Sequence, residues 1–270
     1  MARFMSLRDA VAFAVRDGQS VALEGFTHLI PFAAAHEIIR QGSRELTLIR
    51  MTPDLIYDQM IGMGCARKLV FSWGGNPGVG SLHRFRDAVQ AGWPTPLALE
   101  EHSHAAMANA WAAGAAGLPF AAFRGYRGTS LPDVNPTIRT VVCPFTGEEL
   151  AAVPSLRPDV GVIHAQRADP KGNVLLEGVI GAQKEVVLAS KVAIVTVEEV
   201  VDDLNAPSMN SVVLPGWTID VISVVPRGAW PSYAHGYYDR DNAFYRAWDA
   251  IAADRDGFVT WMERNVLSAA

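Results

Sequence analysis

VALEGFTHLIPFAAAHEIIR, residues 21–40, is the stretch of sequence that decides the fold. It opens with a short apolar run at 21–23, which is typical of a buried strand, and the run breaks at Gly25. After Pro31, which suits the first position of a helix, apolar residues recur at helical spacing. The stretch therefore predicts a strand, a tight glycine turn and a helix.

The turn of this unit, Gly25-Phe26-Thr27-His28, carries polar groups inside an otherwise apolar segment. It lies where the carboxyl end of a strand meets the N-terminus of a helix, and open α/β sheets bind anionic or carbonyl ligands there. Loops at that edge often carry function, but every α/β protein also has turns that only connect elements. The pattern alone leaves a ligand-binding turn and a structural turn both open.

Length and composition narrow the class of protein. With 270 residues, half of them hydrophobic, the chain can bury a sizeable core in one domain spanning 1–270. The net charge of −5 is dispersed without a basic stripe, so nucleic acid is not an expected partner. Cys65 and Cys143 lie far apart, which indicates neither a disulfide framework nor a structural zinc and fits a reducing cytoplasm.

No segment is typical of a membrane or secreted protein. The N-terminus alternates charges through an amphipathic helix and lacks the apolar core of a signal peptide. The least polar stretch, 111–123, is too short to span a bilayer and contains two glycines and a proline. We therefore expect a cytoplasmic protein without membrane contacts.

Strands and helices alternate along the chain. Beyond the first unit, strands are predicted at 46–50, 68–72, 97–100, 160–165 and 192–197, and helices at 6–17, 54–60, 82–90, 105–116 and 182–190. This alternation predicts an α/β fold with an open, mostly parallel sheet and helices on both faces.

Two regions depart from the alternation. Residues 125–158, rich in Gly, Pro, Asp and Asn, are expected to form an excursion over the rim of the sheet, with a small hairpin at 139–143 and 150–153. Residues 201–270, rich in proline and aromatic residues, predict a C-terminal tail that forms an interface with another protein, with an exposed stretch at 229–248 and a final helix at 242–253.

A second glycine-dense turn, SWGGNPGVGS at 72–81, follows another predicted strand. Glycine lets a ligand approach the backbone closely. No Gly-Lys-Ser/Thr follows, and the turn is not a G-x-G-x-x-G fingerprint, so a nucleotide site is poorly supported. We expect Ser72, Trp73, Gly74, Gly75 and Asn76 to face a ligand of another kind.

A third candidate is EEHSH at 100–104, between a strand and a helix. Two carboxylates and two imidazoles could bind a metal, transfer protons or cap the helix. The H-x-H spacing lacks a third ligand, so we expect no metal site, and Ser103 is a suitable N-cap. Capping does not explain the charge at the end of a central strand, so Glu100, Glu101 and His104 are expected at the pocket.

Signatures of nucleophilic catalysis are weak. There is no G-x-S-x-G, and neither cysteine neighbours a histidine. Glu24 and Glu177, each beside a glycine, could act as carboxylate nucleophiles, but each is more often structural. The acidic run that ends at Asp203 is expected to be a solvated strand end or a contact with a basic partner.

Five stretches taken together resemble one known family. They are LEGFTHLIPFAAAHEIIRQG, FSWGGNPGVG, LEEHSHAAMANAWAAGAAGLPF, DPKGNVLLEG and LASKVAIVTVEEVV, in this order over nearly the whole chain. They resemble the α subunit of class I coenzyme A transferases, in the glutaconate CoA-transferase-like branch and most closely its 3-oxoadipate members. The tail AHGYYDRDNAFYRAWDAIA fits that branch too. The resemblance implies the open α/β fold of CoA-transferases (NagB-RpiA-like).

The resemblance also implies an activity. Such enzymes combine an α and a β subunit and move CoA from an acyl-CoA such as succinyl-CoA to 3-oxoadipate or a related dicarboxylate. A glutamate attacks the thioester, the anhydride so formed reacts with CoA to give a glutamyl thioester, and CoA passes to the acceptor acid. In two-chain members that glutamate belongs to the β subunit, so no catalytic residue is expected in this chain. Coenzyme A is a substrate, and no tightly bound cofactor is implied.

By this resemblance, the chain supplies the opposite wall of the pocket, formed by the turn at 25–28, the loop at 72–75 and Glu101 with its neighbours. His28, Ser72 and His104 are candidates for binding the substrate carboxylates. Related ring-opening hydrolases carry an essential glutamate where this sequence has His104, which favours a transferase. A ring-opening hydrolase or thioesterase, and a non-catalytic subunit, remain the alternatives.

Overall fold

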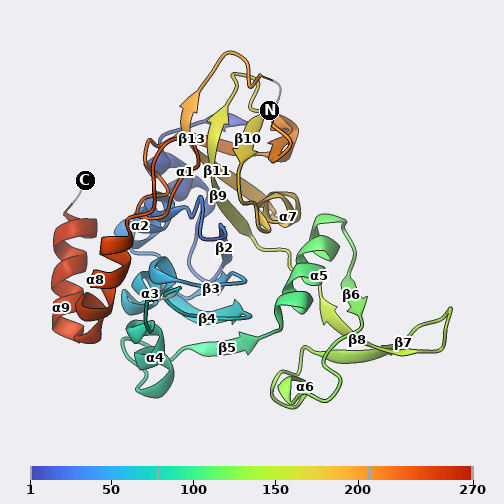
Figure 1. Ribbon diagram of the computed structural model, residues 1–270. Helices are drawn as coiled ribbons and strands as arrows, with labels where there is room; N and C mark the ends of the chain where they lie inside the picture. Colours follow the sequence, from blue (N-terminus) through green and yellow to red (C-terminus); the bar gives the residue numbers. More distant parts are fainter. Residues whose placement is uncertain (1, 78, 206–207, 269–270) are drawn as a thin grey trace.

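The computed structural model describes residues 2–77, 79–205 and 208–268 of the chain. Its main sheet has the order β1-β13-β11-β9-β2-β3-β4-β5, and every neighbouring pair in this order is parallel. These strands are β1 (Arg3–Phe4), β2 (Ser20–Glu24), β3 (Leu46–Ile49), β4 (Ala66–Phe71), β5 (Ala98–Glu101), β9 (Val160–Ala168), β11 (Val192–Val200) and β13 (Val221–Val224). The predicted open, mostly parallel sheet is confirmed (Figure 1).

Helices cover both faces of this sheet, as predicted. Those on the first face are α1 (Leu7–Ala14), α2 (Phe32–Arg40), α3 (Leu55–Gly62), α8 (Asn242–Ala253) and α9 (Arg255–Met262), and those on the second are α5 (His104–Ala115) and α7 (Gln183–Ala189). Val21 and Leu23 of β2 belong to the core on the first face, whereas Ala22 belongs to the core on the second. The two-residue period of a strand produces this alternation. Helix α4 (His83–Gln90) packs against α3 and α8.

Local sequence signals place several helix ends. The Ser6 hydroxyl accepts the N–H of Asp9, and the Ser103 hydroxyl accepts the N–H of Ala106, each at 3.1 Å. Both predicted N-caps are therefore confirmed. Pro31 precedes α2 as its cap residue, one position earlier than predicted.

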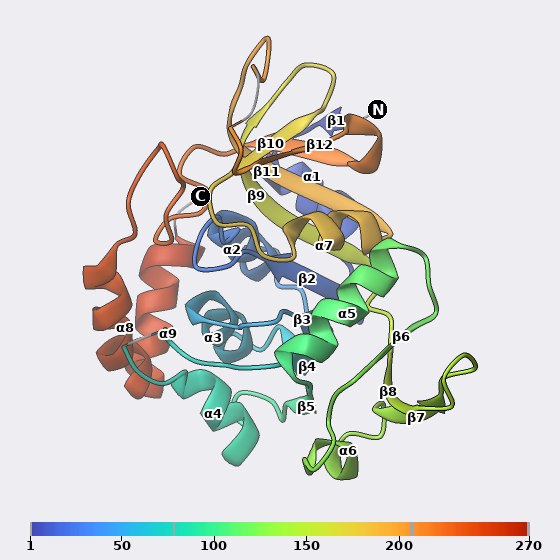
Figure 2. The same cartoon turned by 45° about the vertical axis from the view of Figure 1, so that its right-hand side comes forward.

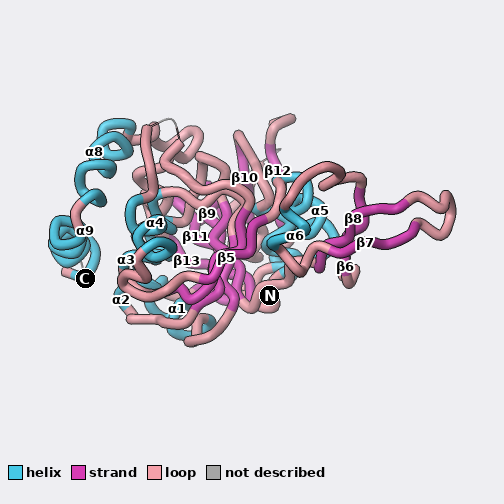
Figure 3. The backbone as a smooth tube through the Cα atoms, turned by 90° about the horizontal axis from the view of Figure 1, so that it is seen from below, coloured by secondary structure: helices cyan, strands magenta, loops and turns pink. Residues whose placement is uncertain are grey.

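The rim excursion is a separate antiparallel sheet of order β6-β8-β7, called here the rim sheet. Its strands are β6 (Phe120–Phe123), β7 (Arg139–Val142) and β8 (Glu149–Pro154), and the one-turn helix α6 (Leu131–Val134) lies between β6 and β7. The stretch from β6 to β8 is called here the rim segment. The predicted hairpin is confirmed as β7 and β8. Strand β6 was not predicted, because FAAF is short and has no alternating pattern. Figure 3 shows the rim sheet on the opposite side of the molecule from α8 and α9.

The exposure predicted for residues 229–248 is wrong for part of that stretch, and other parts of 201–270 pair within the main sheet. β12 (Ser211–Leu214) pairs with β10 (Val174–Glu177), and β13 lies inside the main sheet between β1 and β11. Tyr245 and Trp248 of α8 are 1% and 0% exposed. Aromatic side chains carry large apolar surfaces, and here those surfaces face the first core. The helix predicted at 242–253 is confirmed as α8, but it is not the final one, because α9 follows it. Contact with another protein stays a prediction.

The remaining elements are two short turns of non-α helix: η1 (Gly216–Thr218), between β12 and β13, and η2 (Glu263–Leu267), directly after α9. Across the described residues, no helix has both the length and the apolar composition needed to cross a bilayer.

Candidate functional site

The three candidate loops lie at one edge of the main sheet. They follow β2, β4 and β5, and these strands belong to the parallel series β2-β3-β4-β5. Parallel strands present their carboxyl ends at the same edge, which is where open α/β sheets bind ligands. Figure 2 shows α5 and α7 in front of this part of the sheet. The fold thus brings together segments that lie far apart in the sequence.

The turn after β2 has a strained backbone that only glycine permits at its first position. A Cβ atom on Gly25 would lie 2.7 Å from the Leu29 carbonyl oxygen and 2.8 Å from that of His28. Thr27 and Leu29 have φ angles of 57° and 53°, in the left-handed region that costs a non-glycine residue about 1–2 kcal/mol. Strain of this kind persists only where the surrounding structure holds it, and it clusters at functional sites.

His28 holds this turn against the segment that precedes α8. Its Nε2 accepts the N–H of His235 at 2.9 Å, so its Nδ1 carries the proton and donates to the Val179 carbonyl oxygen at 2.9 Å. Its ring lies 4.4 Å from that of Tyr233. Burial lowers the pKa of His28, which keeps the imidazole neutral. Both ring nitrogens of this predicted pocket residue are therefore engaged within the protein.

Arg50, directly after β3, contacts the turn from the core side. Its Nη2 donates to the Gly25 carbonyl oxygen at 2.6 Å, and its Nη1 donates to Asp54 Oδ1 at 2.9 Å. The side chains of the pair are 1% and 3% exposed. Sequence reasoning did not select this residue. The available signal was an arginine at the end of an apolar strand with an acid four residues later, LTLIRMTPD.

The glycine-rich loop after β4 is tied to the same end of β3. The Ser72 hydroxyl donates to the Met51 carbonyl oxygen at 2.7 Å, and the N–H of Trp73 reaches the same oxygen at 3.2 Å. The N–H of Gly75 donates to the Pro53 carbonyl oxygen at 3.2 Å. The Trp73 side chain is 45% exposed and Gly74 is half-buried, so this part of the loop is accessible.

Asn76 belongs to the interior rather than to the accessible part of that loop. It is 2% exposed, and its amide nitrogen donates to the Tyr245 carbonyl oxygen of α8 at 2.7 Å. This predicted pocket residue therefore fastens the loop to the C-terminal helices.

In the run at 100–104, some side chains form hydrogen bonds within the protein and others are exposed. Glu100 accepts hydrogen bonds from His102 at 3.0 Å and from Lys68 at 2.5 Å, and these contacts lower the pKa of Glu100 to about 2. Glu101 and His104 are exposed. His104 is the first residue of α5, whose N-terminus faces the carboxyl edge of the sheet.

Part of this run is hydrogen-bonded to the rim segment. The hydroxyl of Tyr126 accepts the N–H of Ser103 at 3.0 Å, and the amide of Asn135 donates to the Glu101 carbonyl oxygen at 2.7 Å. Throughout the described residues, no three His, Cys, Asp or Glu side chains converge on a position that could hold a metal ion.

A cavity of about 480 Å³ opens beside the strained turn, between α5 and α7. Its lining is mainly apolar and comprises Glu24, Phe26, Met51, Ala108, Trp111, Ala112, Val179, Ile180, Gly181, Ala182 and Glu185. Phe26 is 43% exposed at its mouth. A mostly apolar cavity with a few polar groups is typical of a small-molecule site.

Glu24 is the buried carboxyl of this cavity. It is 1% exposed, and its Oε1 accepts the N–H of Gly25 at 3.3 Å. Burial raises the pKa of Glu24 from 4.5 to about 7, against the opposing effect of Arg50. The sequence pattern did not distinguish Glu24 from Glu177, which is partly exposed and pairs with Arg167 at 3.5 Å.

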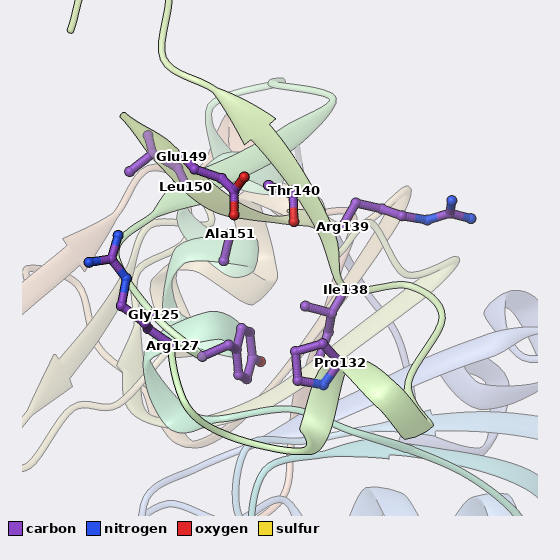
Figure 4. A pocket seen from close by; sticks show the side chains of 10 residues that line it. Gly125, Arg127, Pro132, Ile138, Arg139, Thr140, Glu149, Leu150 and Ala151 are labelled. Carbon is purple, nitrogen blue, oxygen red and sulfur yellow. The ribbon is translucent and has the colours of Figure 1, made fainter. Parts of the chain in front are cut away.

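A second hollow lies in the rim segment and is shown in Figure 4. Its volume is about 150 Å³, and its charged side chains, Arg127, Arg139 and Glu149, carry both signs. None of its lining residues comes from the three candidate loops. We therefore assign the candidate site to the carboxyl edge of the main sheet and the cavity beside it.

The chain belongs to the coenzyme A transferase family, because the family model "Coenzyme A transferase" matches residues 4–224. It is 66% identical to the A-type subunit of the 3-oxoadipate CoA-transferase of Pseudomonas knackmussii, over 98% of this chain and 94% of that protein. The crystal structure of glutaconate coenzyme A-transferase from Acidaminococcus fermentans superposes with a TM-score of 0.91 at 32% identity, covering 98% of this chain and 89% of that one.

A third similar protein is the decarboxylase AibA/AibB, of which a variant has a crystal structure. It superposes with a TM-score of 0.82 at 31% identity and covers 97% of this chain and 99% of that one. The family and the fold indicated by the sequence motifs are thus confirmed, and the class of enzyme is that of CoA-transferases.

The turn after β2 gives a first prediction. Gly25→Ala is expected to lower the free energy of unfolding by about 3 kcal/mol or more, because the new Cβ atom meets backbone that cannot move aside. Urea unfolding followed by circular dichroism measures the change. Gly42→Ala is the matched control, since Gly42 has a φ of 71° but open space around it, and we expect it to cost about 1 kcal/mol. Equal losses in the two variants would contradict the close approach at Gly25.

Glu24 gives a second prediction. Because its pKa is raised in the folded state, the stability it contributes is complete below pH 4.5 and is lost as the pH rises through about 7. Between pH 5 and pH 9, the free energy of unfolding of Glu24→Gln should therefore rise by about 2–3 kcal/mol relative to the wild type. Urea titrations of both proteins at the two pH values test this. A pH-independent difference would be inconsistent with a buried, titrating Glu24.

Proposed function

We propose that this chain is the α subunit of a heteromeric CoA-transferase that moves CoA from an acyl-CoA such as succinyl-CoA to 3-oxoadipate or a related dicarboxylate. The observation that carries the proposal is the 66% identity, over nearly the full length of both chains, to a protein named as one subunit of a 3-oxoadipate CoA-transferase. The glutaconate enzyme, also named for a dicarboxylic acid, supports the same substrate class.

The backbone of the turn after β2 suits the stabilisation of an oxyanion. Attack on a thioester places negative charge on the carbonyl oxygen, and preorganised N–H groups stabilise that charge most effectively where water is excluded. The N–H of Phe26 has no acceptor among the described residues. The turn that carries it is rigid, since Arg50 and His28 hold both of its sides. The turn thus supplies a donor without adding side-chain bulk.

The attacking carboxylate is proposed to come from the β subunit. Glu24, the carboxyl nearest the turn, is 1% exposed, and a pKa of about 7 leaves a large share of it protonated at neutral pH. A protonated carboxyl is a poor nucleophile. This property supports a glutamate on a second chain and leaves the present chain as the opposite wall of the pocket.

The residues that we propose for the pocket lie in the loops at the carboxyl edge of the main sheet. We infer that Gly25, Phe26 and Thr27 face the thioester, with Ser72 to Gly75, Glu101 and His104 around the acids. His28, Asn76 and Glu100 would act by holding these loops, since the ring nitrogens of His28, the amide nitrogen of Asn76 and the carboxylate of Glu100 are hydrogen-bonded within the protein. No tightly bound cofactor and no metal enter this scheme, and coenzyme A is a substrate. A cytoplasmic α/β heterodimer or a larger assembly of such pairs is the proposed form.

Acceptor dependence separates this function from its rivals and gives a third prediction. The chain purified alone should be inactive, and the complex with its β subunit should release or transfer CoA only when a dicarboxylic acceptor is present. Formation of the acceptor's CoA thioester, followed by liquid chromatography, measures this. CoA release without any acceptor would favour a thioesterase or ring-opening hydrolase. Mass labelling that placed the acyl or CoA adduct on a glutamate of this chain would overturn the two-chain scheme.

His104 gives a fourth prediction. In the complex, His104→Ala should raise KM for the acceptor acid by about 10-fold with little change in kcat, because an exposed imidazole at a helix N-terminus would bind a carboxylate in ground and transition state alike. Asn109→Ala, exposed on the same helix and five residues further along, is the matched control. Unchanged kinetics in His104→Ala, Glu101→Ala and Ser72→Ala together would favour a non-catalytic subunit.

A further inference from the structure

We propose that Arg50, paired with Asp54, is a positioning residue that orients the Gly25–Phe26 peptide so that the N–H of Phe26 faces the substrate carbonyl oxygen. The inference rests on the proposed function, because that oxygen belongs to the acyl-CoA thioester. Arg50 itself touches no substrate in this scheme. It acts through the backbone of the turn.

The contacts of the guanidinium leave it little freedom. Nη2 donates to the Gly25 carbonyl oxygen at 2.6 Å, while Nη1 and Nη2 lie 2.9 and 3.4 Å from the two carboxylate oxygens of Asp54. Hydrogen bonds from an ionised donor are shorter and stronger than neutral ones. The guanidinium is also planar, so fixing one edge on Asp54 fixes the direction of the N–H that reaches Gly25.

Peptide geometry carries this orientation to the next residue. The Gly25 carbonyl and the Phe26 N–H belong to one trans peptide unit, in which they point in opposite directions. A hydrogen bond that directs the carbonyl toward the buried Arg50 therefore directs the N–H away from it. Phe26 is 43% exposed and lines the cavity, and its N–H has no acceptor among the described residues. The outward N–H is thus available to a ligand.

The other side of Gly25 is fixed as well. Its own N–H donates to Glu24 Oε1 at 3.3 Å. Glycine has the widest conformational freedom of any residue, so a turn that begins with glycine needs such contacts to keep one peptide orientation. Without Arg50, rotation of the peptide unit would direct the Phe26 N–H into the core and leave the developing oxyanion without this donor.

The test is Arg50→Lys in the complete complex of this chain with its β subunit. Lysine keeps a positive charge beside Asp54 but cannot hold the carboxylate and the Gly25 carbonyl with one rigid group. Loss of one preorganised oxyanion donor costs about 10²–10³-fold in kcat, so partial misorientation should lower kcat by about 10- to 100-fold. KM for the acyl-CoA should stay within about 3-fold, because the interaction is made only in the transition state.

Two further variants keep the result interpretable. Asp58→Asn alters another fully buried carboxylate, which accepts the N–H of Phe85 and the indole N–H of Trp248 and does not touch the turn. It should lower the melting temperature but leave kcat unchanged. If Arg50→Lys does not fold, the double variant Arg50→Gln/Asp54→Asn removes both charges together, so that no unpaired charge is buried, and it should show the same loss of kcat.

The outcomes are distinct. A fall in kcat at constant KM, with wild-type kcat in Asp58→Asn, supports the positioning role. Wild-type kcat in Arg50→Lys or in the double variant overturns it, as does a loss that appears only in KM or equals the loss in Asp58→Asn. If the wild-type complex transfers no CoA, the proposed function fails first, and the inference about Arg50 fails with it.

Discussion

The rest of the site depends on one buried ion pair, that between Arg50 and Asp54. Removing an ion from water costs several kcal/mol even after relaxation, so a guanidinium that is 1% exposed requires close polar partners. Asp54 supplies the charge, and the Gly25 carbonyl supplies a further acceptor at 2.6 Å. Removing one member of such a pair destabilises a protein more than replacing both members by apolar residues. The turn after β2 is therefore held by an interaction that the folded chain cannot give up cheaply.

The same short segment also connects the turn to the glycine-rich loop. Arg50 binds the turn after β2, while the carbonyl oxygens of Met51 and Pro53 accept the hydrogen bonds of the loop after β4. The end of β3 thus lies between two loops and bonds to both. The glycine-rich loop is also bonded to α8, through the side chain of Asn76. A change at the end of β3 would therefore move both walls of the candidate site together.

Sequence reasoning found the elements that have periodic signals and missed those that depend on one residue or one short strand. The alternation of strands and helices, the caps at Ser6 and Ser103 and the rim hairpin each leave a local pattern. β13 is only four residues long, and nothing local places it between β1 and β11. Arg50 and Glu24 derive their importance from burial, which a single sequence does not display. The two ring nitrogens of His28 bond to partners more than 150 residues away, so these contacts too are invisible in the local pattern.

The carboxyl edge also explains why a second chain suits the proposed reaction. Thioester chemistry on a carboxylate requires that water be kept from the anhydride. On this chain, Phe26 and Trp73 are 43% and 45% exposed at that edge, and the Phe26 N–H has no acceptor among the described residues. Large apolar side chains at the mouth of a cavity lose water favourably when another surface covers them. A partner that brought its glutamate to this edge would therefore gain binding energy from the same contacts that exclude water from the site. Assembly of the two chains would then also protect the anhydride from hydrolysis.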